Sequence, residues 1–165
     1  MPIKNKSRVY RRSTVGNLLA RFEEQRKFIQ ILAGPRQSGK TFIARQAMEE
    51  ADISSHYATA DEPSIKDRLC LEQQWNTGRL LEKEKGKALL VLDEIQKIPG
   101  WSEIVKWLWD EDSARSANLH VLLLGSSPLL LQKGMTDIVN ELRPPRIIAF
   151  FKNQCKGTDS SIYCP

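Results

Sequence analysis

The strongest constraint on the fold lies between Phe28 and Thr41, where the sequence is FIQILAGPRQSGKT. An apolar run leads into a glycine-bounded loop, and a helical pattern follows. The segment Gly34–Thr41 fits the phosphate-loop pattern G-x-x-x-x-G-K-[ST] at every specified position. Glycines let such a loop curl so that successive N–H groups face one anion at the start of a helix. The stretch therefore predicts a strand, an anion-binding loop and a helix, in that order.

The flanking sequence supplies the context that this motif requires. Residues 28–33 are nearly all apolar, which is typical of a parallel strand covered on both faces. The helix predicted for Lys40–Ala51 has apolar residues on one side, and Ser13–Gln25 has the spacing of a further helix before the strand.

A triphosphate is the natural ligand of such a loop. We expect the contacts to come from eight consecutive residues: Gly34, Pro35, Arg36, Gln37, Ser38, Gly39, Lys40 and Thr41. Lys40 would reach the β and γ phosphates, and the Thr41 hydroxyl would bind Mg²⁺. The alternative, a glycine turn that only joins strand to helix, explains the glycines but not the adjacent Lys-Thr pair.

A second apolar run, residues 87–92, ends in Asp93 and Glu94. Two acids at the carboxyl end of a buried strand suit a nucleotide hydrolase. Asp93 would hold the Mg²⁺ directly or through water, and Glu94 would polarise the attacking water. Alone this pattern is weak, since many strands end at acids, but the phosphate loop in the same chain strengthens it.

A third apolar run, His120–Leu124, is followed by Gly125, Ser126 and Ser127. The ligand lies at the carboxyl ends of the strands in a parallel nucleotide-binding sheet. We therefore expect Ser126, or else Ser127, to contact the γ-phosphate or the water. A helix cap is an equally good and compatible interpretation.

The remaining segments predict ordinary structural roles. Residues 54–60 suggest a strand, and residues 64–87 a helical stretch with a break near Gly78, in which Trp75 would anchor the core and Arg79 would be a surface cation. Three tryptophans cluster at positions 101, 107 and 109. They could stack on bases, but packing against the sheet is the favoured interpretation.

Composition limits the possible class of protein. The chain has 165 residues, 41% hydrophobic and 27% charged, which suits one globular domain without a membrane span. Three cysteines in no metal-binding spacing, with no signal peptide, favour reduced thiols in the cytoplasm. Five of the 25 basic residues fall within residues 1–12, so 25 − 5 = 20 remain against 20 acids. This basic arm either contacts phosphates or an acidic partner, or is a solvated terminus.

Three segments together resemble a known family: GPRQSGKT, DEIQKIPGWSEIVKWLWDED and LLLGSSPLLLQKGMTD. They are similar to the prokaryotic AAA-type ATPases that carry a C-terminal domain of unknown function after the ATPase core. The similarity runs from about Val9 to Asp137. It implies a three-layer α/β fold of the RecA-like type, with a mostly parallel sheet in the order 5-1-4-3-2. It also implies ATP and Mg²⁺ as cofactors and coupling to a partner or to a neighbouring subunit.

The resemblance ends after Asp137. Members of that family continue with a segment of the type GLTESLxGRFE, whereas this chain has Leu142 where the arginine would align. We therefore expect a basic arm at 1–12, an ATPase core at 13–150 with a fifth strand near its end, and an irregular tail at 151–165 of a truncated kind. Without that arginine, binding should persist and hydrolysis should be slow. A non-catalytic nucleotide-binding remnant or gated interaction module is the alternative.

Overall fold

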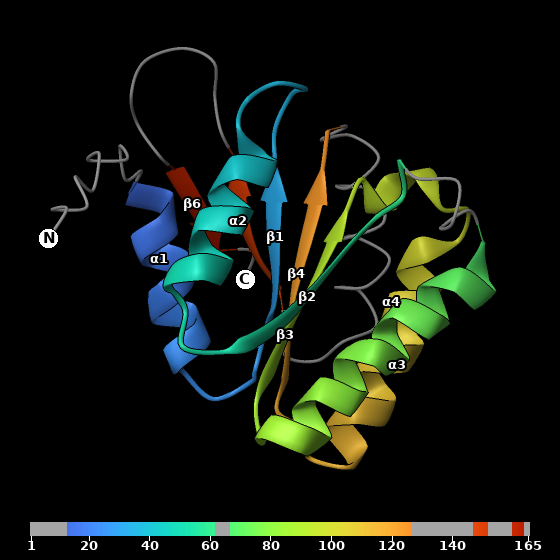
Figure 1. Cartoon of the computed structure of the whole chain (residues 1–165). Coiled ribbons are helices and arrows are strands. Elements are labelled where there is room, and N and C mark those ends of the chain that lie inside the picture. The colour runs from blue at the N-terminus through green and yellow to red at the C-terminus, as the bar shows by residue number, and fades with distance from the viewer. Residues whose placement is uncertain (1–12, 62–66, 127–146, 152–159, 164–165) are drawn as a thin grey trace, which may run out of the picture.

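The computed structural model describes residues 13–61, 67–126, 147–151 and 160–163. A central β-sheet has helices on both faces, so the fold has three layers (Figure 1). In chain order the elements are α1 (Ser13–Glu23), β1 (Ile29–Ala33), α2 (Lys40–Glu50), β2 (Ser54–Thr59), α3 (Arg68–Lys85), β3 (Ala88–Asp93), the 3-10 turn η1 (Ile95–Lys97), α4 (Trp101–Ala114), β4 (Leu119–Gly125), β5 (Ile147–Phe151) and β6 (Ser160–Tyr163).

The sheet has the strand order β2-β3-β4-β1-β5-β6. Strands β1 to β5 pair in parallel, which confirms the predicted order 5-1-4-3-2. The sixth strand was not predicted. It lies within the segment 151–165 that the sequence suggests is irregular, and it pairs antiparallel with β5. Because β6 covers one side of β5, β5 is not the edge of the sheet.

Successive side chains along the central strands point to opposite faces of the sheet, so the core has two layers. Ile29 and Ile31 of β1 point toward α3 and α4, whereas Leu32 points toward α1 and α2. The same alternation occurs in β3 and β4, where every residue is buried. Helices therefore cover both faces of these strands, which is why their sequences are continuous apolar runs.

The predicted break at Gly78 is wrong, because α3 runs without interruption from Arg68 to Lys85. Gly78 instead allows a close approach to the sheet: a Cβ at this position would lie 3.2 Å from Leu119 Cδ1. The helix begins where the Asp67 side chain accepts a hydrogen bond from the Cys70 N–H, and it ends at Gly86, with φ of 77°.

Candidate functional site

Strands β1, β3 and β4 are parallel neighbours, so their carboxyl ends meet at one edge of the sheet. The loop between β1 and α2 leaves this edge beside the end of β4, where Gly34 N–H donates to Gly125 O at 3.3 Å. Helix α2 begins after Gly39, whose φ of 84° is readily adopted only by glycine. The predicted strand, loop and helix are thus present, with the helix N-terminus facing the edge.

Lys40 lies inside the curve of the loop and is only 5% exposed. Its Nζ donates hydrogen bonds to Gly34 O and Pro35 O, both at 2.8 Å. The lysine ammonium is therefore held between the beginning of the loop and the helix that follows it. Arg36 and Gln37, by contrast, are exposed on the outside of the loop.

Asp93, at the end of β3, joins the loop to the neighbouring strands. Its Oδ2 accepts hydrogen bonds from Thr41 Oγ1 at 2.8 Å and from the Tyr57 hydroxyl at 2.7 Å. Its Oδ1 accepts from the Glu94 N–H at 2.9 Å. Burial, followed by the hydrogen bond to Asp93, raises the pKa of Tyr57 well above its usual value, so this hydroxyl remains a protonated donor.

Glu94 follows in the left-handed conformation, with φ of 55°. Glu94 Oε2 accepts from Ser126 Oγ at the end of β4 and from Gln96 Nε2 in η1, both at 2.6 Å. The two donors also approach each other, with 3.3 Å between Gln96 Nε2 and Ser126 Oγ. Donors from two different elements therefore fix one oxygen of the Glu94 carboxylate.

The structure brings together the side chains that the motifs single out. Thr41 meets Asp93, and Ser126 meets Glu94, from segments far apart in the sequence. Ser127, the second choice for the serine role, lies outside the described residues, as do Leu142 and the basic arm.

Two residues that contact these acids, Tyr57 and Gln96, were not predicted from the sequence. Tyr57 is on β2, the strand that pairs with β3, and its side chain packs on the α2 side of the sheet. The strand order implied by the family resemblance, combined with alternation along β2, could have identified it. Gln96 had no comparable signal, because only the left-handed turn at Glu94 brings its side chain back to the carboxylate.

A second polar cluster lies between α3 and α4, around Asp112, which is fully buried. Asp112 accepts from Trp75 Nε1 and Arg79 Nε, each at 2.8 Å, and it pairs with Arg115 at 3.0 Å. The prediction that Trp75 anchors the core is confirmed. The prediction that Arg79 is a surface cation is wrong, because its side chain is only 17% exposed and also pairs with Glu111.

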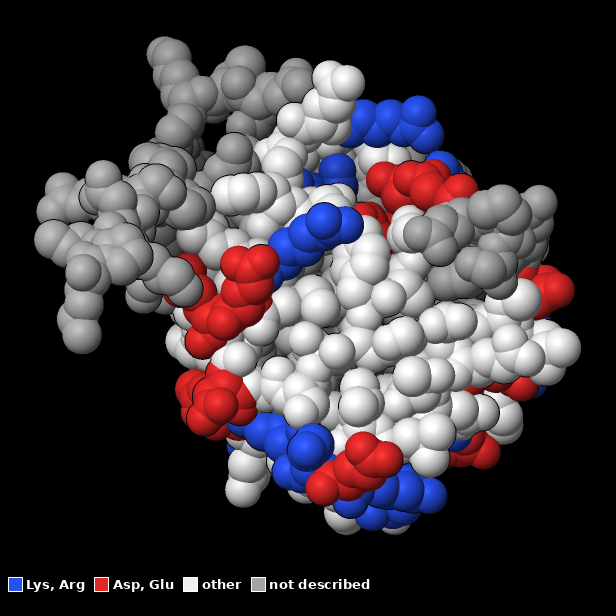
Figure 2. All heavy atoms as spheres, viewed as in Figure 1, with Lys and Arg blue, Asp and Glu red and all other residues white. Residues whose placement is uncertain are grey.

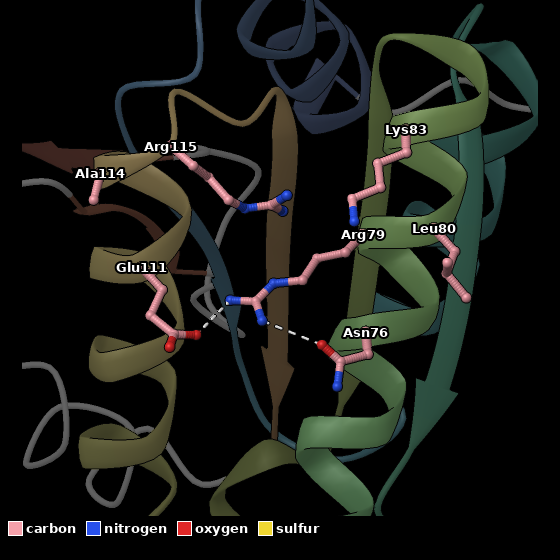
Figure 3. Close-up of a pocket in the computed structure, with 7 residues that line it drawn as sticks. All are labelled: Asn76, Arg79, Leu80, Lys83, Glu111, Ala114 and Arg115. Carbon is pink, nitrogen blue, oxygen red and sulfur yellow. Dashed lines mark hydrogen bonds and ion pairs between the residues drawn. The ribbon is translucent and has the colours of Figure 1, made fainter.

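Arg79, Glu111 and Arg115 also line a pocket of about 610 Å³ (Figure 3). Arg79 extends across it from α3 toward α4, and Glu111 extends toward Arg79 from the opposite side. Its lining comes from the middle and C-terminal part of α3 and from the C-terminal end of α4 with the residue that follows it: Asn76, Arg79, Leu80, Lys83, Glu111, Ala114 and Arg115. Helix α3 ends where β3 begins, so this pocket is nearer the amino ends of the strands than the phosphate loop is.

The predicted packing of Trp101 and Trp109 against the sheet is confirmed, since both are buried in the core. Trp107 is 45% exposed and has the Arg68 guanidinium 5.3 Å from its ring centre. Acidic and basic side chains are interspersed on the face shown in Figure 2, around a broad uncharged area. This mixture agrees with the near-neutral charge calculated for residues beyond the basic arm.

The strand, the phosphate loop and the acid at the end of β3 define a P-loop nucleotide-binding domain. The family comparison then gives the particular class: residues 26–143 match the model described as AAA domain. The chain belongs to this AAA domain family. Its core is of the AAA ATPase type, as the sequence predicts. No curated protein matches the chain.

Solved structures support the same fold. One, from a study of katanin self-assembly, has a TM-score of 0.52 at 21% identity, and the match covers 81% of this chain and 44% of that one. Another, Cdc6p from Pyrobaculum aerophilum, has a TM-score of 0.53 at 16% identity over 82% of this chain and 41% of that one. The chain thus spans less than half the length of both. Among the described helices, none has the length and apolar character needed to cross a membrane.

Proposed function

We propose that this chain binds ATP in a Mg²⁺-dependent manner, hydrolyses it slowly, and couples its nucleotide state to a partner. The observation that carries the proposal is the 2.8 Å hydrogen bond between Thr41 Oγ1 and Asp93 Oδ2. It joins the last residue of the phosphate loop, in the first turn of α2, to the acid that ends β3. A glycine turn of purely structural purpose would not require that contact.

Phosphate binding would use the loop from Gly34 to Thr41. Its backbone N–H groups and the N-terminus of α2 favour an anion. Lys40 supplies the positive charge from inside the loop and would exchange its contacts with Gly34 O and Pro35 O for phosphate oxygens. The lysine would therefore stabilise the loop without ligand and the phosphates with it.

Thr41 and Asp93 together suit a magnesium ion, because Mg²⁺ prefers oxygen ligands and takes few of them from the protein beside a nucleotide. Within the residues that the structure describes, no cluster of three or more His, Cys, Asp or Glu forms a metal cage. A site completed by phosphates and water needs no such cage. When bound, the ion would neutralise charge that develops on the phosphates.

Hydrolysis would depend on Glu94 as the group that orients and deprotonates water. Ser126 and Gln96 hold one oxygen of this carboxylate, which leaves the other oxygen for the water. We infer a low rate, because the sequence has Leu142 where related ATPases have an arginine. A transition-state arginine contributes about 10³ to 10⁵ in rate in phosphoryl-transfer enzymes.

A non-catalytic nucleotide-binding module is the second candidate. The same hydrogen bonds favour it, because Glu94 Oε2 already has two donors and could be held away from water. In that case the loop would bind nucleotide and only signal its presence. Both candidates leave room for self-association, a protein partner or, with less support, nucleic acid. The thiol content is consistent with a cytoplasmic location for either.

Three proteins separate these candidates: the wild type, Lys40→Ala and Glu94→Gln. Nucleotide binding is measured with a fluorescent ATP analogue and hydrolysis by phosphate release. The ATPase proposal expects binding to be lost only in Lys40→Ala, and slow turnover to be lost in Glu94→Gln with ATP retained. Equal phosphate release by the wild type and Glu94→Gln favours the non-catalytic module. A wild type that binds no nucleotide rejects both.

A further inference from the structure

We propose that Tyr57 is a positioning residue of the magnesium site, which acts by fixing the Asp93 carboxylate. The inference rests on the proposed Mg²⁺-dependent binding of ATP, but it does not require hydrolysis. The family motifs in the sequence do not point to this tyrosine, and it is not part of the phosphate loop.

The register of the sheet places Tyr57 where its hydroxyl can form a hydrogen bond with the Asp93 side chain. In the register of β2 and β3, Thr59 is opposite Asp93, and Tyr57 is opposite Val91. Tyr57 and Val91 both belong to the α2 side of the sheet. A tyrosine two residues before the end of β2 can therefore extend along the sheet toward its carboxyl edge. Its hydroxyl reaches Asp93 Oδ2 at 2.7 Å.

The ring that carries this hydroxyl is held on more than one side. It packs against the apolar cluster between the sheet and helices α1 and α2. The Arg45 guanidinium of α2 lies 5.6 Å from the centre of the ring. Because the ring is restrained, the position of the hydroxyl is restrained as well.

The Tyr57 hydroxyl helps to fix the orientation of the Asp93 carboxylate. Oδ1 is held by the Glu94 N–H, and Oδ2 by Thr41 and Tyr57. Without the tyrosine hydroxyl, only Thr41 would hold Oδ2, and Thr41 is itself proposed to bind the metal. Groups that orient metal-binding carboxylates typically change metal affinity by about 10- to 100-fold. Tyr57 would thus keep Asp93 aligned while the Thr41 hydroxyl turns to the ion.

The test compares wild type, Tyr57→Phe and Thr59→Val. The phenylalanine removes only the hydroxyl and keeps the packed ring. Thr59→Val removes a hydroxyl from another partly buried residue of the same strand, but that hydroxyl accepts from Asp61 N rather than contacting Asp93. A fluorescent ATP analogue is titrated first in EDTA and then at increasing MgCl₂ concentrations.

For Tyr57→Phe we expect an unchanged affinity in EDTA and an about 10-fold higher MgCl₂ concentration for half-maximal tightening. Thr59→Val should match the wild type in both conditions. An unchanged MgCl₂ midpoint in Tyr57→Phe overturns the inference. Equal weakening in EDTA and in MgCl₂ also overturns it, because it indicates a merely structural role. Absence of Mg²⁺-dependent binding in the wild type instead rejects the proposed function on which the inference depends.

Discussion

Two buried aspartates, Asp93 and Asp112, are stabilised in opposite ways. Asp93 is 5% exposed, and its hydrogen bonds in the described structure come from neutral donors, two hydroxyls and a backbone N–H. Asp112 is fully buried, and two arginines balance its charge. A buried carboxylate without a paired cation is costly unless a cation binds. The uncompensated charge of Asp93 supports the proposal that it binds a cation, whereas the charge of Asp112 is already balanced within the fold.

The largest effect is expected when Asp112 loses its charge. Asp112→Asn leaves Arg79 and Arg115 without their common carboxylate, and breaking a buried ion pair in this way costs about 3 kcal/mol or more. Urea unfolding should show this loss, with little change in nucleotide affinity for the folded protein. Glu111→Gln is the matched control: Glu111 is 43% exposed, and exposed pairs contribute about 1 kcal/mol or less. Equal losses in both variants would contradict the central role of Asp112.

The same substitution at Asp93 should affect binding more than stability. We expect Asp93→Asn to reduce the Mg²⁺-dependent gain in ATP affinity by about 100-fold, because the metal loses its charged partner. The free energy of unfolding should change by less than about 1 kcal/mol, since relief of a buried charge offsets weaker hydrogen bonds. Metal titrations and urea unfolding measure the two effects. A stability loss equal to that of Asp112→Asn would show that the two aspartates are not different in kind.

His120 shows a third way to bury an ionisable group, which is to keep it neutral. It is 4% exposed, it packs edge-on against Phe22, and its Nε2 has no hydrogen-bond partner within the described residues. Burial, with smaller contributions from Lys87 and Arg26, lowers the pKa of His120 to about 4. The unfolded chain takes up this proton near pH 6.5, whereas the folded chain resists it until about pH 4.

Stability from His120 is therefore complete above pH 6.5 and decreases as the pH falls toward 4. Between pH 7 and pH 5 we expect a loss of about 2 kcal/mol in the free energy of unfolding. Urea unfolding at both values checks this, and His120→Leu should remove that part of the pH dependence. If His120→Leu keeps the full decrease, the proton is taken up elsewhere. Mg²⁺-dependent ATP binding at pH 7 should be unaffected, in contrast to Asp93→Asn.

The sequence predicted what depends on chain order and on short motifs. The glycine pattern before Lys40 and the acids after an apolar run located the loop and β3, and the family resemblance supplied the strand order. Contacts that require tertiary packing were not predicted. The ion pairs of Arg79 depend on how α4 packs against α3, and the close approach of Gly78 to Leu119 depends on how α3 packs on the sheet. Strand β6 has no sequence pattern that separates it from a loop.

The smallest effect is expected at Gln96, which contacts Glu94, the neighbour of Asp93. Gln96 Nε2 and Ser126 Oγ are neutral donors to the Glu94 carboxylate, just as Asp93 has neutral donors. Gln96→Leu removes one of these two hydrogen bonds and keeps a side chain of similar size. Because general bases contribute about 10² to 10⁴ in rate, imperfect positioning of Glu94 should reduce single-turnover hydrolysis by about 10-fold. Affinity for ATP in MgCl₂ should not change.

A parallel loss of affinity in Gln96→Leu would indicate a structural role for Gln96. The same conclusion would follow if Gln96→Leu slowed hydrolysis but Glu94→Gln did not. Addition of Ser126→Ala to Gln96→Leu should slow hydrolysis further, because both donors hold the same oxygen of Glu94.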